Sequence, residues 1–200
     1  MFLPYRGGVR LSETQALYEA MARESAVRFP SRKTVSGIGP ERPAVMLIGE
    51  APGAKEVEEG RPFAGAAGKN LDGFLAATGL TRETLYISNV VKIRPCELGP
   101  TGRLRNRPPN KEEIAFFLPW LEKEILLLKP RLLVTLGNTP LKALYRADST
   151  VGACHGQLLE SRPGLPLFSL YHPASLIYNR SLAAVYRADM ERLAQIIQSM

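Results

Sequence analysis

The stretch AVMLIGEAPGAKEVEEGRPFAGAAG, residues 44–68, decides the fold class of this chain. Its first five residues form an apolar run without alternation, which is typical of a strand buried on both faces of a parallel sheet. A glycine-rich segment follows directly, with Glu50 as its first polar residue. In parallel sheets, ligands gather beyond the carboxyl ends of the strands. We therefore predict an α/β domain with a candidate binding segment directly after this strand.

Working outward, the same kinds of segment recur along the chain. Further apolar strands are predicted at 84–91 and 131–137, with a fourth in the strand-like pieces between 151 and 171. Apolar residues at helical spacing predict helices over 11–25, 70–79, 111–128 and 181–198, and another helix beginning at 138. This alternation predicts a three-layer α/β/α sandwich with a central, mostly parallel four-stranded sheet.

Two segments lie outside this regular pattern. Residues 1–43 are predicted to be an N-terminal helix and an irregular lead-in, packed on the same domain as residues 44–200. Ser12 followed by Gln15 predicts a capping box at the start of that helix. Residues 94–110 are predicted to be a long basic loop with four prolines. A loop of that length inside a compact domain is usually functional or disordered.

Composition narrows the class of protein. Two hundred residues with 45% hydrophobic and 22% charged content suit a single globular domain. No apolar run approaches the roughly 20 residues that span a bilayer, and the first twenty residues lack an apolar signal core. We therefore expect a soluble, cytoplasmic protein without membrane association. The net charge of +7 is compatible with a polyanionic partner such as nucleic acid.

Three polar segments follow predicted strands. The segment 49–68 contains Glu50 and Phe63, but no GxxxxGK[ST] motif, and its four carboxylates would repel a triphosphate. Asn89 ends the second strand, where an amide can donate and accept at once, as reading a base edge requires. His172 follows the last strand and precedes a proline.

These residues also allow structural interpretations. Glu50 could cap nearby backbone amides, and Phe63 could be an ordinary core aromatic under the loop. Leu176 and Ile177 could form an exposed apolar tip, beside Arg180, that enters a base stack. Alternatively, both could pack into the core and begin the last helix.

Three motifs, taken together, resemble those of the uracil-DNA glycosylase superfamily. They are GEAPG…GRPFAGAAG at 49–68, SNVVK at 88–92 and YHPASL at 171–176. The most similar branch is family four, and PRLLVTLGNTPLKAL at 130–144 resembles its central strand and following helix. The resemblance covers residues 44–200. It implies a monomeric repair enzyme that extrudes uracil from single- or double-stranded DNA and hydrolyses its N-glycosidic bond, leaving an abasic site.

The resemblance also implies roles for the matching residues of the base pocket. Glu50 matches a carboxylate implicated in hydrolysis, and Ala51 belongs to the same substrate-binding motif. Phe63 matches the aromatic residue that stacks on the extruded base. Asn89 matches the amide that reads the uracil edge. His172 matches the histidine that hydrogen-bonds the uracil O2.

Other expected contacts lie around that pocket. Glu56 matches a second acidic position, and Leu176 lies in the loop that fills the vacated base stack. We expect basic side chains to hold the flanking phosphates of the DNA. These are Arg180 and Arg105, with Arg103 and Arg107 beside them.

The chain departs from family four at the iron–sulfur cluster. The four cysteines of that cluster correspond to Ala22, Ser25, Ile93 and Phe117. The two cysteines present, Cys96 and Cys154, cannot replace four thiolates. We therefore expect no iron–sulfur cluster and no other metal or cofactor, with apolar packing at Ile93 and Phe117 in its place.

Two smaller departures concern chemistry. Val57 stands where an acidic residue is usual. The long loop resembles a branch that traps uracil covalently on a histidine, but the matching position is Arg105, so no covalent adduct is expected.

The same residues bear on three other functions. A zinc deaminase is excluded because Pro95-Cys96 lacks the second thiolate of a PCxxC motif. A non-catalytic DNA-binding module of the same fold stays open, as does a glycosylase for another deaminated base such as hypoxanthine.

Overall fold

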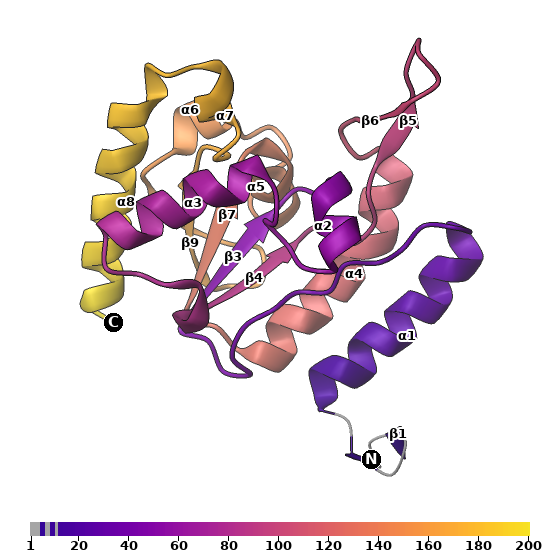
Figure 1. The fold of residues 1–200 in the computed structure, drawn as a ribbon. Coiled ribbons are helices and arrows are strands. Elements are labelled where there is room, and N and C mark those ends of the chain that lie inside the picture. Colours follow the sequence, from indigo (N-terminus) through magenta and orange to yellow (C-terminus); the bar gives the residue numbers. More distant parts are fainter. Residues whose placement is uncertain (1–4, 7–8, 11) are drawn as a thin grey trace.

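The computed structural model describes residues 5–6, 9–10 and 12–200 (Figure 1). The strands are β1 (Tyr5–Arg6), β2 (Val9–Arg10), β3 (Val45–Gly49), β4 (Leu85–Asn89), β5 (Cys96–Leu98), β6 (Leu104–Asn106), β7 (Leu132–Leu136), β8 (Leu158–Glu160) and β9 (Pro166–Leu170). The helices are α1 (Glu13–Arg28), α2 (Ala54–Glu59), α3 (Ala66–Ala77), the 3₁₀ helix η1 (Arg82–Thr84), α4 (Lys111–Leu128), α5 (Asn138–Leu144), α6 (Val151–Cys154), α7 (Ser175–Tyr178) and α8 (Leu182–Gln198). Among these helices, none combines the length and the apolar character needed to cross a membrane.

The central sheet has five strands in the order β4-β3-β7-β9-β8. The first four run parallel, and β8 pairs antiparallel with β9 at the edge. Every residue of β3, β4 and β7 is buried, as expected for strands covered on both faces. The predicted α/β/α class is therefore confirmed. The predicted count of four strands is too low by one, because the short piece 158–160 pairs as an edge strand of its own.

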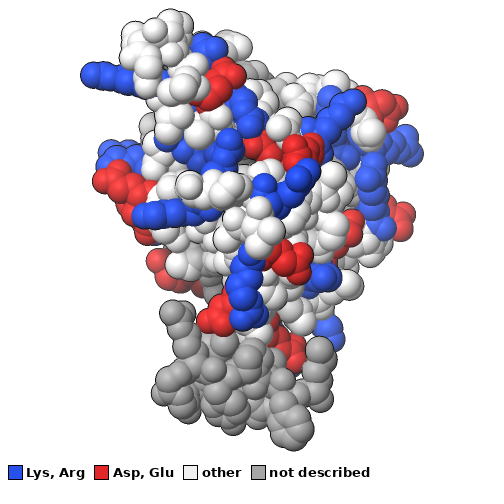
Figure 2. All heavy atoms as spheres, turned by 90° about the vertical axis from the view of Figure 1, so that its right-hand side faces the viewer, with Lys and Arg blue, Asp and Glu red and all other residues white. Residues whose placement is uncertain are grey.

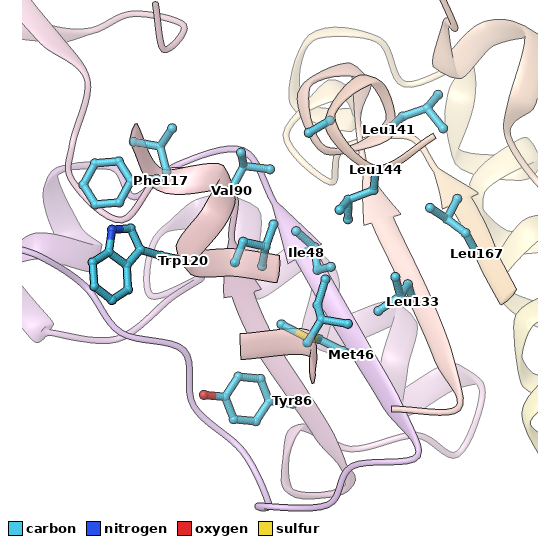
Figure 3. Packing of buried hydrophobic residues seen from close by; sticks show 14 of the residues in the cluster. Met46, Ile48, Tyr86, Val90, Phe117, Trp120, Leu133, Leu141, Leu144 and Leu167 are labelled. Carbon is cyan, nitrogen blue, oxygen red and sulfur yellow. The ribbon is translucent and has the colours of Figure 1, made fainter. Parts of the chain in front are cut away.

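Two hydrophobic clusters cover the two faces of the sheet. Met46, Ile48 and Leu133 point to one face, where they pack under side chains of α4 and α5 (Figure 3). Val45, Leu47 and Val134 point to the other face, where they meet α3 and α8. Alternate residues of one strand thus enter different clusters, as the pleat requires. The layers are visible in Figure 1, with α3 and α8 on one side of the sheet and α4 on the other.

Helix α1 lies outside α4 and packs against it. Its Met21 is buried in the same cluster as Phe117 and Trp120 of α4. The predicted capping box is present, because Ser12 accepts from the Gln15 amide while Gln15 accepts from the Ser12 amide. Residue 11, where we expected this helix to begin, lies outside the described residues.

The long basic loop predicted at 94–110 is instead a β-hairpin for much of its length. Strands β5 and β6 pair antiparallel, and the turn between them is closed by a bond from the Gly99 amide to the Arg103 carbonyl at 2.8 Å. Gly102 adopts a left-handed conformation in that turn, with φ of 73°. The strands have three residues each and are flanked by prolines, so the sequence contains no alternating pattern long enough to predict them. The hairpin projects from the body of the molecule (Figure 1).

Candidate active site

A pocket opens at the carboxyl ends of β3 and β4, where parallel sheets bind their ligands. Its volume is about 380 Å³, which suits a small molecule. Five of the expected site residues line it, together with other small residues of the glycine-rich segment. The lining includes Ala51, Gly53, Glu56, Phe63, Asn89, Asn106, His172 and Ala174.

The side chains of Asn89 and Phe63 both lie close to the backbone of Gly49. Gly49 and Asn89 are register partners on adjacent strands, and both therefore point to the same face of the sheet. A Cβ atom on Gly49 would lie 2.4 Å from Asn89 Oδ1 and 2.8 Å from Phe63 Cζ, so no larger residue fits there. Asn89 is 3% exposed, yet its side-chain amide makes no hydrogen bond to any described residue. A buried amide without a partner at a pocket wall has unused capacity for a ligand.

Phe63 is held in an unusual backbone conformation. Its φ is +53°, which a bulky side chain rarely adopts. The carbonyl of Phe63 accepts a bond from Arg82 Nη2 at 2.8 Å, and a Cβ on Gly68 would lie 1.8 Å from that same carbonyl oxygen. Arg82 is itself fixed by Asp72. Backbone strain of this kind clusters at binding sites, where the surrounding structure holds a side chain in place.

His172 lies against Phe63 and presents one ring nitrogen to the pocket. The two rings are 5.8 Å apart between centroids, with planes 27° apart. The backbone amide of Ala174 donates to His172 Nδ1 at 3.1 Å, so the proton of a neutral ring sits on Nε2. Burial lowers the pKa of His172 to about 4, although the nearby Glu56 carboxylate acts in the opposite direction. His172 is therefore a neutral hydrogen-bond donor at neutral pH.

Glu50 lies at the rim of an adjoining pocket of about 330 Å³. The two pockets share Ala51, Gly53, Asn106, His172 and Ala174, so they form one continuous hollow. The hydroxyl of Thr139, at the start of α5, donates to Glu50 Oε2. This contact orients the carboxylate, whose Oε1 makes no hydrogen bond to a described residue.

Glu56 has a different environment from Glu50. Its Oε2 accepts from the Gly53 amide at 3.1 Å, and its Oε1 accepts from the Gly65 amide at 3.0 Å. The carboxylate thus joins the two ends of the glycine-rich segment. Although Glu56 lines the pocket, its oxygens are committed to the backbone. Ala51 lines both pockets, as a small residue between Glu50 and Pro52.

The residues expected to contact DNA lie on two separate elements. On and beside α7, Leu176 is half-buried and packs against the core, whereas Ile177 is 50% and Tyr178 is 88% exposed. Of the two alternatives for this pair, packing on the core thus holds for Leu176 and exposure holds for Ile177. Arg180 is exposed and makes no ion pair with the described residues.

The arginines of the hairpin differ in their pairing. Arg105 lies 2.7 Å from Glu97 on the outer strand surface, and Arg107 forms a forked contact with Glu113 at 2.7 and 2.8 Å. Glu113 therefore uses the charge of Arg107 to anchor the hairpin to α4. The phosphate contact expected of Arg107 stays a prediction. Arg103 makes no ion pair within the described part of the chain. Figure 2 shows basic and acidic side chains interspersed on this side of the molecule, without a continuous basic field.

The four positions that correspond to cluster cysteines do not suit an iron–sulfur cluster. Ser25, Ile93 and Phe117 are fully buried, and the Phe117 ring stacks on Phe29 with centroids 5.8 Å apart. No thiolate is available there, and Ser25 Oγ is buried without a hydrogen-bond partner. Within the ranges that the structure describes, no group of three or more His, Cys, Asp or Glu side chains could hold a metal ion. Cys96 and Cys154 are free and lie on different elements.

Sequence reasoning missed three residues of this region. Thr139 follows β7, and the same rule that indicated the ends of the other parallel strands would have indicated it. Asn106 lines both pockets from the hairpin, which the sequence pattern did not predict. Arg82 contacts the Phe63 carbonyl from η1, and no local motif signals that contact.

Comparison with known proteins agrees with this arrangement of motifs. The model of the uracil DNA glycosylase superfamily matches residues 36–195. A type-4 uracil-DNA glycosylase of Pyrobaculum aerophilum is 37% identical over 166 residues, which cover 80% of this chain and 81% of the relative. Its counterpart in Thermotoga maritima is 32% identical over 157 residues, covering 77% of this chain and 78% of the relative.

A solved structure supports the fold independently. The crystal structure of SMUG2 from Pedobacter heparinus superposes with a TM-score of 0.56 at 13% identity, covering 79% of this chain and 76% of that one. At that identity the likeness concerns the fold alone. With the family match extending over most of the sequence, the chain belongs to the uracil-DNA glycosylase superfamily.

Proposed function

We propose that this protein is a monofunctional DNA glycosylase that removes uracil from single- or double-stranded DNA by hydrolysis and leaves an abasic site. The observation that carries the proposal is the convergence of four side chains on one hollow. Glu50, Phe63, Asn89 and His172 come from three distant parts of the sequence, yet all line the two joined pockets. A base inside a duplex cannot reach such a pocket, so the nucleotide must be extruded first.

Recognition of the base rests on Phe63 and Asn89. The Phe63 ring offers a face on which a planar base can stack, and such stacking is worth about 1–3 kcal/mol per base. The Asn89 amide can donate to uracil O4 and accept from the N3–H. Cytosine presents the reverse pattern, a donor at C4 and a bare N3, so the same amide orientation opposes it. The adjoining Gly49 keeps the amide and the ring close together.

His172 would stabilise the leaving group. When the bond between uracil N1 and deoxyribose C1′ breaks, its electron pair moves to the base and spreads onto O2. The neutral His172 ring can donate Nε2–H to that oxygen while Nδ1 remains bonded to the Ala174 amide. A donor placed in this way is typically worth about 3–4 kcal/mol of barrier lowering.

Glu50 would act on the sugar side of the same bond. Its free oxygen can orient a water molecule toward C1′ and accept a proton as the water oxygen bonds to that carbon. Its negative charge also offsets the positive character that the sugar acquires. The uracil anion then takes a proton from solvent and Glu50 gives its proton back to solvent, so water and deoxyuridine yield an abasic site and uracil. No step of this scheme requires a cofactor or a metal.

The protein would act as a monomer. The DNA on either side of the extruded nucleotide would be held at the rim of the pocket. We propose that Arg180 and Arg103, which have no ion-pair partner, contact phosphates, with Arg105 beside them. The gap left by the extruded nucleotide would be filled from α7. Its exposed side chains are Ile177 and Tyr178, with the half-buried Leu176 supporting them from the core side.

The test is an excision assay on oligonucleotides that contain uracil, hypoxanthine, cytosine or thymine, followed by alkali treatment. Strand scission at uracil alone supports the proposal. Replacing Glu50 by Gln should lower the single-turnover rate by about 10²–10⁴-fold, because a general base contributes that much. Glu59→Gln is the matched control, since Glu59 is an exposed carboxylate of the same segment, paired with Arg61.

Each alternative function has its own outcome in this assay. Tight binding of uracil-containing DNA without scission would favour a non-catalytic DNA-binding module. Scission at hypoxanthine rather than uracil would assign a different base to the pocket. A Glu50→Gln protein as fast as the Glu59→Gln control would refute the role of Glu50.

A further inference from the structure

The hairpin β5–β6 has two chemically different faces. Because side chains alternate along a strand, Glu97 and Arg105 share one face, where they form an ion pair. The other face presents Asn106 at the base of the hairpin and the cross-strand pair Leu98 and Leu104 farther out. Asn106 lines both joined pockets, so this second face is the one turned toward their mouth. We call it the inner face.

Asn106 is oriented by a neighbour. The Nε of Arg94 donates to Asn106 Oδ1 at 2.7 Å, which assigns the oxygen and leaves the Nδ2 amino group facing Gly53 and the pocket. No described residue accepts a hydrogen bond from Nδ2. The mouth of the pocket therefore carries a donor with no partner inside the protein.

The apolar pair is an unusual surface feature. Leu98 is 71% exposed and Leu104 is 56% exposed, and the two are register partners in the antiparallel pair. Single exposed leucines are common, but opposed leucines at the end of a projecting hairpin indicate a surface that meets a partner.

The base of the hairpin is fixed, so this surface has a defined direction. The Arg107 amide donates to the Pro95 carbonyl at 3.2 Å, closing the two chains together. Glu113 of α4 then pairs with both Arg107 and Arg32, at 2.7 and 3.1 Å. Arg32 also donates to the Arg94 carbonyl at 3.2 Å. A clamp of this kind holds the inner face toward the pocket mouth before any ligand arrives.

The charge of the hairpin indicates a polyanionic partner. Residues 94–107 contain four arginines and one glutamate. Arg103, next to Leu104, has no ion-pair partner in the described ranges. A surface that combines an apolar pair, a free guanidinium and an amide donor matches a nucleic acid strand, whose bases are apolar on their faces and whose backbone is anionic.

We propose that the inner face of the hairpin is a DNA-binding surface. Asn106 Nδ2 donates to the sugar–phosphate of the extruded nucleotide, Leu98 and Leu104 pack against the neighbouring bases of that strand, and Arg103 contacts a phosphate beyond them. The inference deepens the proposed function and depends on it for the identity of the extruded nucleotide. It extends the phosphate contact already proposed for Arg103 to the inner face as a whole, beside the contacts proposed for α7.

The experiment compares Leu98→Ser/Leu104→Ser and Asn106→Ala with the native protein and a matched control. The control is Leu126→Ser/Leu158→Ser, because Leu126 is 68% and Leu158 is 52% exposed, both away from the pocket lining. Uracil excision is measured at increasing enzyme concentration, which separates half-saturation from maximal rate. Binding of a uracil-free duplex is measured by fluorescence anisotropy at several salt concentrations.

We expect both hairpin variants to need about tenfold more enzyme for half-saturation, which corresponds to about 1.4 kcal/mol. The maximal rate should stay within about twofold for the leucine variant, because its contacts hold substrate without touching the reacting atoms. Arg103→Ala should reduce the salt slope of binding by about one. The leucine control should match the native protein in every measurement.

Two results separate this inference from the proposed function. A native protein that excises uracil, with hairpin variants that match the leucine control in half-saturation, would overturn the inference alone. A native protein that excises no uracil would overturn the proposed function. In that case, unchanged anisotropy of the hairpin variants on uracil-free DNA would overturn the inference as well. Circular dichroism of each variant excludes misfolding as the cause.

Discussion

Ser88 and Asn89 are neighbours at the end of β4, but their side chains lie in two regions of contrasting chemistry. Successive strand residues point to opposite faces, so Ser88 faces α4 and Asn89 faces the pocket. Behind Ser88, polar groups pair with one another: Lys92 Nζ lies 2.6 Å and Ser88 Oγ lies 3.1 Å from the same Glu124 oxygen. On the other face, no described residue bonds the Asn89 amide.

The paired region extends to the N-terminal helix. Tyr18 of α1 donates to the second Glu124 oxygen and lies 3.0 Å from the Tyr86 hydroxyl, while the Gly37 amide donates to Tyr18 at 2.7 Å. Lys92 and Glu124 are 1% and 0% exposed. Buried polar groups whose partners the chain supplies hold the fold together, whereas the buried amide at the cavity wall remains available to a ligand.

The largest effect should come from breaking the buried pair. Lys92→Met leaves the Glu124 carboxylate buried beside two hydroxyls and without its ammonium. Removing one partner of a buried ion pair costs about 3–5 kcal/mol of unfolding free energy. Burial lowers the pKa of Lys92, and the Glu124 carboxylate opposes that shift. Urea unfolding at pH 7 measures the loss.

The double variant Lys92→Met/Glu124→Leu is the control for this prediction. Replacing both partners by apolar residues removes the buried charge, so the double variant should regain most of the lost stability. The uracil excision rate of the folded double variant should stay near that of the native protein. A single Lys92→Met change that costs less than about 1 kcal/mol would show that the paired region is not a structural element.

Replacing Lys92 should affect stability more than activity. Replacing His172 should affect activity more than stability. His172→Leu should lower the single-turnover excision rate by about 10²–10³-fold, because one donor to the developing charge is lost. His172→Gln retains an N–H donor and should recover part of that rate. Since the folded pKa of His172 is about 4, below the usual 6.5, the folded state binds fewer protons than the unfolded state.

This lowered pKa means that the free energy of unfolding falls as the pH falls. The contribution of neutral His172 to stability is complete above pH 6.5 and is lost as the pH falls from 6.5 toward 4. In this window, urea unfolding of the native protein should lose about 1 kcal/mol per pH unit relative to His172→Leu, which has no group to titrate there. Parallel pH curves for the two proteins would contradict a buried, neutral imidazole.

The fold was largely predictable because it depends on local patterns. The unbroken apolar runs at β3, β4 and β7 and the helical spacing of α4 and α8 each predict one element, and their alternation predicts the sheet. The hairpin β5–β6 was not predictable in this way. Its strands have three residues each and expose most of their side chains, so no periodic apolar signal marks them.

The candidate site was predictable only in part. Glu50, Asn89 and His172 follow strand ends, and the topology of a parallel sheet brings such residues to one edge. Thr139, which bonds Glu50, follows β7 and could have been found by the same rule. Asn106 lines the hollow from the hairpin, and one sequence contains no signal for that contact between distant segments.

The smallest change in stability should come from replacing Ser25. Its side chain, in α1, is as fully buried as those of Lys92 and Glu124, but its hydroxyl has no hydrogen-bond partner among the described residues. Burying an unpaired hydroxyl costs about 1–3 kcal/mol, so Ser25→Ala should raise the unfolding free energy by about 1 kcal/mol. Glu24→Ala, an exposed change on the same helix, should stay within about 0.5 kcal/mol.

A variant of Ser25 also tests whether the positions that correspond to cluster cysteines pack without a metal. Because an alkyl group, a phenyl ring and a hydroxyl replace thiolates at this place, purified protein should show no visible absorption from iron, and Ser25→Ala should keep native excision activity. Visible iron absorption that disappears in Ser25→Ala would contradict this prediction. A fall in stability on Ser25→Ala would mean that the hydroxyl has a partner, and would move Ser25 from the unpaired to the paired class of buried polar groups.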